Sequence, residues 1–244
     1  MPTGRSMSNI PGTFFKPALL GSLPPQAMQY LTHAIRPGSL IPRQVEVDFS
    51  GLIRLQPRKR WLDFTTREEI RCCEGFIFNA HAKLGLFSMT IEDRYEAGSA
   101  ESQIRLLGLI PVSTKRGVDI NRAAASRLVV ESLWLPSTFL PAAGAVWSIE
   151  TGKVHVSIPV HREEIKCHIK LGPNGEVRLM RLERWSNFTD GGRYRMIHYS
   201  VHVYAERSFS YYTIPSQIEA FWSTGTDREI SFFRATVESA SYIF

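Results

Sequence analysis

The sequence lacks long apolar runs and the short motifs that mark several common enzyme classes. No stretch of about 20 consecutive apolar residues occurs, which argues against a membrane-spanning helix. The nucleophile elbow G-x-S-x-G, the Walker phosphate loop and the dinucleotide-binding glycine fingerprint are also absent. We therefore expect neither an integral membrane protein nor an α/β-hydrolase, a P-loop NTPase or a Rossmann-type dehydrogenase.

Cysteine is scarce, with three residues in 244. Cys72 and Cys73 are adjacent and point to opposite faces of a strand, so with Cys167 they do not form a secreted disulfide framework. An inward cysteine is more often a packing residue than a nucleophile. Residues 1–26 are interrupted by proline and glycine and contain no apolar segment typical of a signal peptide. We expect a cytoplasmic protein.

Charge of one sign is not concentrated anywhere. The chain carries 29 Lys and Arg against 23 Asp and Glu, a net charge of +6, and the densest basic segment, residues 54–60, is expected in a solvated turn. The seven histidines show no ligand spacing. His198 and His202, four apart on one strand, would lie roughly 13 Å apart. We expect no nucleic-acid partner, no metal and no other cofactor.

Most of the chain alternates with the period of two that is typical of half-buried strands. In the first such segment, Val45, Val47 and Phe49 face one way. Short breaks suit antiparallel hairpins, with an Asn-Gly turn at residues 172–176 and a glycine-rich turn at 189–193. Strands are expected at residues 44–55, 61–72, 76–84, 87–97, 101–112, 146–149, 153–160, 164–171, 176–188, 194–208, 210–214, 218–224 and 230–243.

Two amphipathic helices accompany these strands. The first is expected at residues 22–36, and the second begins at Asp119, whose carboxylate can cap it, and stops at Pro136. Because large antiparallel sheets twist and curl, we predict a mainly β fold, a large curved sheet forming a half-barrel or barrel covered by two helices. Residues 1–21 are expected to form a loosely ordered arm, and residues 22–244 one domain with an apolar cavity.

Three ionisable residues are predicted near this apolar interior. Arg127 and Glu131 lie four residues apart on the second helix, close to its apolar stripe, and Asp93 shares a strand face with Met89 and Tyr95. A carboxylate placed there must meet a cation, accept several hydrogen bonds, or carry a raised pKa and act as an acid or base. Asp93, Arg127 and Glu131 are therefore either catalytic or an ion network that pins helix to sheet.

Further candidates come from the same alternation. Arg181 and Glu183 interrupt an apolar row at residues 176–188 and are either secondary site residues or cross-strand ion pairs. The chain has 14 Phe, 8 Tyr and 5 Trp, enough to line a cavity, although aromatic side chains usually fill cores. The candidate ligand-binding residues are Phe78, Met89, Tyr95, Trp134 and Trp185.

Several segments together resemble an uncharacterised family of bacterial and archaeal proteins of similar length. They are LPPQAMQYLTHAI, WLDFTTREE, CEGFIFNAHAKL, IEDRYEAG, LLGLIPV and RLVVESLWLPSTFLP, covering most of residues 23–147. Arg127, Glu131, Trp134 and Pro136 are the most specific part of the match. The family's architecture looks like that of the lipoprotein-carrier (LolA-like) proteins, a bent sheet with helices over its concave side. The resemblance implies an architecture and no reaction.

Three functions remain open from the sequence. In the first, a hydrophobic metabolite enters the cavity, and Asp93, Glu131 and Arg127 promote cofactor-free cyclisation, isomerisation, lyase chemistry or a related proton transfer. In the second, the protein is a non-catalytic carrier of a lipid-like ligand. In the third, it is a partner-binding module that displays a sheet edge. The first is favoured, because charge placed near an apolar cavity costs stability that a passive carrier has no evident need to lose.

Overall fold

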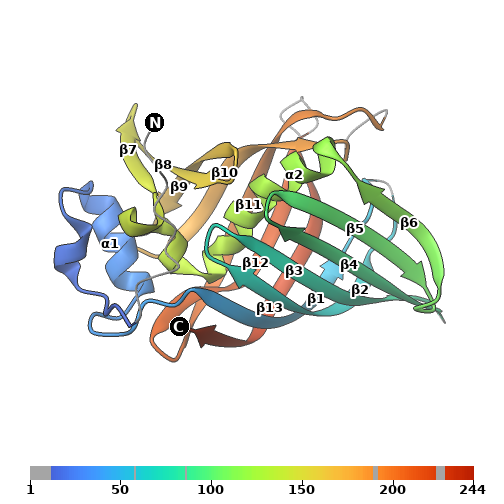
Figure 1. Cartoon of the computed structure of the whole chain (residues 1–244), viewed down its shortest axis with the longest axis horizontal. Coiled ribbons are helices and arrows are strands. Elements are labelled where there is room, and N and C mark those ends of the chain that lie inside the picture. The colour runs from blue at the N-terminus through green and yellow to red at the C-terminus, as the bar shows by residue number, and fades with distance from the viewer. Residues whose placement is uncertain (1–11, 58, 86, 189–191, 224–228) are drawn as a thin grey trace.

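A single 13-stranded antiparallel sheet, curved and open, forms the body of the protein (Figure 1). The computed structural model describes residues 12–57, 59–85, 87–188, 192–223 and 229–244. The mainly β fold predicted from the alternation is confirmed. The strands are β1 (Gln44–Ile53), β2 (Leu62–Arg71), β3 (Gly75–Leu84), β4 (Phe87–Glu96), β5 (Ser99–Leu106), β6 (Ile110–Arg116), β7 (Val146–Glu150), β8 (Lys153–Val160), β9 (Glu163–Leu171), β10 (Val177–Ser186), β11 (Arg195–Phe209), β12 (Tyr212–Ser223) and β13 (Glu229–Ile243).

The sheet consists of two meanders, β1–β6 and β7–β13, joined along one seam. Within each meander every strand pairs with the next along the chain, and β1 pairs with β13 to make the sheet continuous. The edge strands are therefore β6 and β7, which are consecutive in the chain. The seam is close at Gly51, where an added Cβ would lie 1.9 Å from the main-chain oxygen of Arg234.

The second helix connects these two edges. Helix α2 (Val118–Glu131) follows β6, and three short 3-10 turns, η3 (Ser132–Trp134), η4 (Pro136–Phe139) and η5 (Pro141–Ala143), lead from it to β7. It contacts β10 most extensively and also strands β3 to β6, so it packs against both meanders (Figure 1). Helix α1 (Pro25–Ala34) packs instead on β12 and η4 at one end of the molecule.

Helix boundaries differ from the predictions for local reasons. Asp119 does not cap α2, because the N-cap is Gly117 and the Asp119 carboxylate accepts a hydrogen bond from Trp185 Nε1 at 2.7 Å. The helix ends at Glu131, before Pro136, and the Ser132 hydroxyl donates to the Leu128 carbonyl at 2.7 Å. The first helix is shorter than residues 22–36, because two prolines hold its N-terminal side outside the helical region.

Two strand predictions were wrong. Residues 101–112 are not one strand: Leu107 and Gly108 adopt φ values of 53° and 70° and turn the chain between β5 and β6, inside an otherwise continuous apolar segment. Residues 210–214 and 218–224 belong largely to one strand, β12, whose Pro215 lies opposite a bulge in β11.

The predicted Asn-Gly turn is confirmed by the hydrogen bond from the Gly172 main-chain N–H to the Glu176 carbonyl. Residues 189–191 of the second predicted turn lie outside the described residues.

The core fills the concave side of the sheet and continues to the end where α1 packs. Within the predicted N-terminal arm, Phe15 and Leu20 are buried and η2 (Pro17–Leu20) contacts α1. Phe14 remains half exposed and bridges to Leu40. No helix among the described residues is both long and apolar enough to cross a membrane.

Replacing Gly51 with Ala tests the seam between the meanders. The new methyl group meets main-chain atoms of β13 that cannot move without breaking strand pairing, so we expect the free energy of unfolding to fall by about 1–3 kcal/mol. Urea denaturation measures this change. Ser50→Ala is the matched control, since it removes only an exposed hydrogen bond to Glu238. Equal urea midpoints for Gly51→Ala and the unaltered protein would show that the seam tolerates the methyl group.

Candidate functional site

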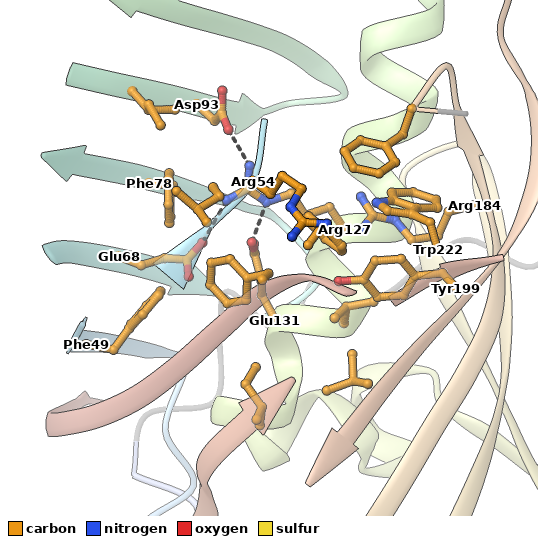
Figure 2. A pocket seen from close by; sticks show the side chains of 18 of the residues that line it. Phe49, Arg54, Glu68, Phe78, Asp93, Arg127, Glu131, Arg184, Tyr199 and Trp222 are labelled. Atoms are coloured by element: carbon orange, nitrogen blue, oxygen red, sulfur yellow. Dashed lines mark hydrogen bonds and ion pairs between the residues drawn. The ribbon is translucent and has the colours of Figure 1, made fainter. Parts of the chain in front are cut away.

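A pocket of about 260 Å³ lies between α2 and the concave face of the sheet (Figure 2). Most of its wall is apolar, and both meanders contribute to it. Its lining residues are Phe49, Ile53, Arg54, Leu55, Glu68, Phe78, Ile91, Asp93, Ser102, Ile104, Arg127, Val130, Glu131, Leu133, Trp134, Arg184, Phe188, Tyr199, Val201, Pro215, Ile218, Trp222, Phe232 and Phe233.

Aromatic side chains build two walls of this pocket. On one side, Phe49 of β1 packs against Trp134, with ring centroids 4.8 Å apart. The Trp134 indole is fixed by a hydrogen bond from Nε1 to the Pro215 carbonyl at 3.1 Å. On the other side, Tyr199 packs edge-on to Trp222 at 4.7 Å. The walls are therefore held in place by contacts among themselves, which favours a preformed cavity.

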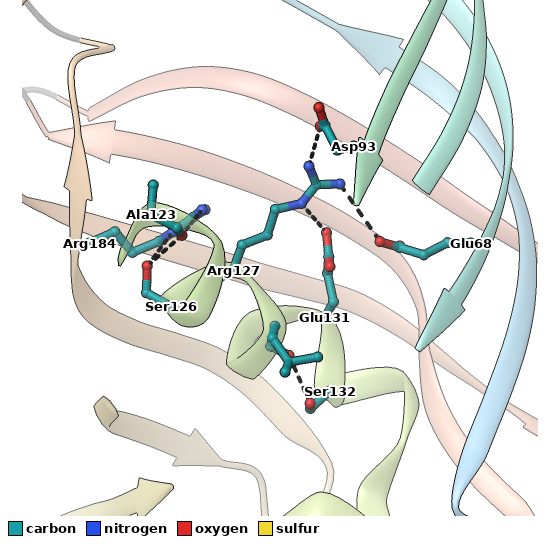
Figure 3. Close-up of polar contacts among 9 residues, drawn as sticks. Glu68, Asp93, Ala123, Ser126, Arg127, Glu131, Ser132 and Arg184 are labelled. Atoms are coloured by element: carbon teal, nitrogen blue, oxygen red, sulfur yellow. Dashed lines mark hydrogen bonds and ion pairs between the residues drawn. The ribbon is translucent and has the colours of Figure 1, made fainter. Parts of the chain in front are cut away.

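One guanidinium gathers three carboxyl groups at the pocket (Figure 3). Arg127 of α2 pairs through Nη1 with Asp93 of β4 and through Nε with Glu131 one helical turn on. Its Nη2 lies 3.7 Å from Oε1 of Glu68 on β2. The guanidinium carbon also lies 4.6 Å from the ring centroids of Phe76 and Phe78, within cation–π range. This ion cluster, Glu68–Asp93–Arg127–Glu131, connects the helix to two strands.

The carboxyl groups of this cluster keep unused hydrogen-bonding capacity. Within the described residues, both carboxyl oxygens of Glu68, Oδ1 of Asp93 and Oε2 of Glu131 are buried without a hydrogen-bond partner. Each of these residues lines the pocket. Buried polar atoms are normally paired, so the free oxygens can meet a group that enters the pocket.

The charge balance of the cluster favours a neutral Glu68. Glu68 is fully buried. This desolvation is the main cause that raises the pKa of Glu68 well above its ordinary value of 4.5, and the nearby Glu131 carboxylate is the second cause. Burial alone would lower the pKa of Arg127, but Glu131, Asp93 and Glu68 raise it, so the guanidinium remains charged. The cluster thus contains one permanent cation and a carboxylic acid that can donate a proton.

A second buried arginine lies on the other side of the pocket. Arg184 of β10 hydrogen-bonds through Nε to the Ser126 hydroxyl at 3.3 Å and through Nη2 to the Ala123 carbonyl at 3.4 Å, both on α2 (Figure 3). Its guanidinium carbon lies 4.5 Å from the Tyr199 ring centroid and 5.1 Å from that of Trp222. Arg184 therefore ties α2 to the second meander.

The structure brings together five of the predicted site residues. Asp93, Arg127 and Glu131 form the ion pairs of the predicted network and also line the pocket, and a catalytic role for them stays a prediction. Phe78 and Trp134 line the pocket as well.

Three predicted ligand-binding residues are not part of the pocket lining. Tyr95 is buried against Phe76 and His161, and Met89 is buried elsewhere along β4. Trp185 stacks on Tyr194 and lies under Arg122 outside this pocket.

Glu68 and Arg184 were not predicted as site residues, and the sequence contains a signal only for Glu68. Glu68 follows Leu62, Phe64 and Thr66 at alternate positions of β2, which all face inward. In β10 the alternation is broken by a register shift between Val177 and Leu179. This shift places Arg181 and Glu183 outward, contrary to the apolar row predicted for them, and turns Arg184 toward the pocket.

Metal-binding geometry does not occur in the part of the chain that the structure describes, where no group of three or more His, Cys, Asp or Glu side chains could hold an ion. Cys72 and Cys73 are free thiols outside the pocket lining. The polar groups that line the pocket are chiefly its carboxyl groups and the guanidinium groups of three arginines, Arg54, Arg127 and Arg184.

Comparison with known proteins gives a family and a set of distant structural similarities. The model of a family of unknown function, DUF6544, matches residues 13–235, in agreement with the resemblance seen in the sequence. No curated protein matches the chain.

Solved structures that match the chain include a LolA superfamily protein from Nitrosomonas europaea, at TM-score 0.48 and 7% identity over 90% of this chain and 92% of that one. A putative outer membrane lipoprotein-sorting protein domain from Vibrio parahaemolyticus has TM-score 0.45 and 7% identity over 82% of this chain and 85% of that one. A DUF1329 family protein from Desulfovibrio piger has TM-score 0.43 and 6% identity over 82% and 86%.

Glu68→Gln should remove a pH dependence of stability. Folding raises the pKa of Glu68, so the protonated group stabilises the native state. This contribution to the free energy of unfolding is complete at pH values below the unfolded-state pKa and is lost as pH rises through the folded-state pKa. Glutamine does not titrate, so the variant should gain stability relative to the unaltered protein as pH rises above 4.5. Urea unfolding at several pH values, with the exposed Glu164→Gln as control, measures the difference. Parallel pH profiles would contradict the raised pKa.

Arg127→Met should destabilise the protein strongly at neutral pH. It leaves the cluster's carboxyl groups buried without their cation, at an expected cost of about 3–5 kcal/mol. Adding Asp93→Asn and Glu131→Gln to this variant should restore much of the loss, because no unpaired charge then remains. Chemical denaturation of the single and triple variants tests this coupling. If the single variant matches the unaltered protein, the ion cluster does not hold α2 in place.

Proposed function

Because the chain belongs to DUF6544, a family of unknown function, its role must be inferred from its own residues, and we propose that its pocket binds a hydrophobic small molecule. The observation that carries this proposal is the cavity of about 260 Å³ walled by aromatic and aliphatic side chains from both meanders. At about 30 Å³ for each water-sized group, this volume suits a ligand of roughly nine non-hydrogen atoms.

The apolar wall supplies the driving force for binding. Each methylene group transferred from water into such a wall contributes roughly 0.8 kcal/mol. An alkyl chain or a small ring system can therefore offset the entropy lost on binding, which is several kcal/mol. The preformed walls around Trp134 and Tyr199 limit the additional cost of ordering side chains. A binding or carrier protein for a lipid-like ligand needs no group beyond these.

Acid–base chemistry on the bound ligand is the second candidate function. Glu68, with its raised pKa, is a potential proton donor at neutral pH, and the free oxygens of Asp93 and Glu131 are potential acceptors on the same pocket wall. Such a pair of groups supports cofactor-free isomerisation or cyclisation of a hydrophobic compound. In this candidate, Arg127 holds the acceptor carboxylates in position through its ion pairs with them.

Filling the pocket tests the binding function. Val130 of α2 lines the cavity and is buried, so Val130→Phe places a larger ring in the space of the ligand. We expect compounds that co-purify with the protein in native mass spectrometry to be lost from this variant. Val146→Phe, at a position 65% exposed on β7, makes the same substitution outside the pocket and should retain them. Equal ligand retention by both variants would contradict binding in this pocket.

The two candidate functions differ in what Glu68→Gln does to the ligand. A carrier returns the same compound from both proteins, since Glu68 then only contributes to the wall. An isomerase or cyclase converts its substrate, so the variant should accumulate an unconverted isomer with a different chromatographic retention. Chromatography coupled to mass spectrometry of the extracted ligands distinguishes these results. Identical ligands from both proteins exclude a proton-transfer role for Glu68.

A further inference from the structure

Arg184 is a buried cation whose direct contacts contain no anion. Its residue is only 7% exposed, and no ion pair to it occurs among the residues that the structure describes. Its direct contacts are the Ser126 hydroxyl, the Ala123 carbonyl and the phenol of Tyr199, all of them neutral, while the Glu131 carboxyl acts on it through space without an ion pair. Arg127, by comparison, has three carboxyl groups around it. An arginine buried in this way is costly unless a negative charge meets it.

The geometry around Arg184 prepares it to receive such a charge. Tyr199 and Trp222 lie within cation–π distance of the guanidinium, which restricts its orientation. Its hydrogen bonds to α2 use Nε and Nη2. The residue lines the pocket and lies on the opposite side from Asp93 and Glu68 in Figure 2. A guanidinium restricted in this way loses little entropy when it binds a planar carboxylate.

The two sides of the pocket therefore differ in the charge that they attract. An anion beside the Glu68–Asp93–Arg127–Glu131 cluster would meet carboxyl groups that already occupy the guanidinium. Beside Arg184 it would meet a cation with no competing carboxylate in contact. Apolar side chains such as Val201 and Ile218 also line the pocket. This separation fixes both the chemistry and the direction of a bound amphiphile.

We propose that the ligand is a hydrophobic carboxylate whose head group pairs with Arg184, while its apolar body extends along the wall toward the ion cluster. This proposal rests on the binding function proposed above and adds the chemical class of the ligand. Arg184 is then the residue that determines specificity for an acid over an alcohol or an amine with the same chain.

Three probes with one alkyl chain test the head-group preference. Isothermal titration calorimetry with octanoate, octanol and octylammonium at neutral pH measures their dissociation constants for the full-length protein. Each probe is close to the size that the cavity accepts. We expect octanoate to bind at least tenfold more tightly than octanol, because the charge-assisted pair with Arg184 is available to the carboxylate alone. Octylammonium should bind more weakly than octanoate.

Substitutions then assign the preference to one side chain. Arg184→Gln should weaken octanoate binding at least tenfold and leave octanol binding unchanged. Arg181→Gln, at the outward-facing neighbour on the same strand, is the matched control and should preserve the preference. Arg54→Gln tests the third arginine of the pocket, which stacks on Trp61 at 4.5 Å and donates to the Pro57 carbonyl at 3.2 Å. If Arg54→Gln alone removes the preference, the assignment to Arg184 is overturned.

The outcomes separate this inference from the proposed function. If none of the probes binds, the binding function itself fails and the ligand class fails with it. If octanoate shows no advantage, or octylammonium binds best, the pocket remains a binding site and the carboxylate proposal is wrong. Circular dichroism and thermal unfolding establish whether Arg184→Gln is folded. Should it not fold, Arg184→Lys decides, since the loss of the planar fork should reduce the ratio of octanoate to octanol affinity.

Discussion

The arrangement of the pocket depends on one guanidinium that must neutralise buried carboxyl groups from three elements. Arg127 contacts carboxyl groups on β2, on β4 and on its own helix. In a low-dielectric interior, removing this cation destabilises the protein far more than the ion pairs themselves stabilise it, because the carboxyl groups stay buried without a counter-charge. The position of α2 relative to the first meander follows from this requirement. Arg184 supplies the corresponding contact to the second meander by bonding to α2. Two arginines thus hold one helix over the concave face.

Arg127 belongs to α2 and Arg184 contacts the same helix from β10, yet their electrostatic surroundings differ. Three carboxyl groups surround Arg127, so a neutral Glu68 reduces the excess of negative charge there, whereas the groups in direct contact with Arg184 are neutral. The apolar pocket consequently has an acidic side and a basic side. A cavity with this polarity differs from a simple apolar core, in which buried charge is absent or fully paired.

The sequence predicted the positions of site residues correctly in those strands where inward and outward side chains alternate without interruption. Regular alternation in β4 and helical spacing in α2 placed Asp93, Arg127 and Glu131 on facing surfaces, and they meet. The same alternation in β2 pointed to Glu68. The prediction from alternation failed in β10, because one bulge there reverses which face the following residues occupy. Nothing in the sequence marks the position of this bulge. Tyr95 and Met89 share the face of Asp93, but the pocket occupies only part of that strand.

The connection of α2 has a mechanical consequence. The helix joins the two outermost strands of an open sheet and is clamped to the interior strands by Arg127 and Arg184, so it cannot swing aside as a hinged lid would. Moving α2 away from the concave face therefore requires the contacts of both arginines to break, or the two edge strands to move with it.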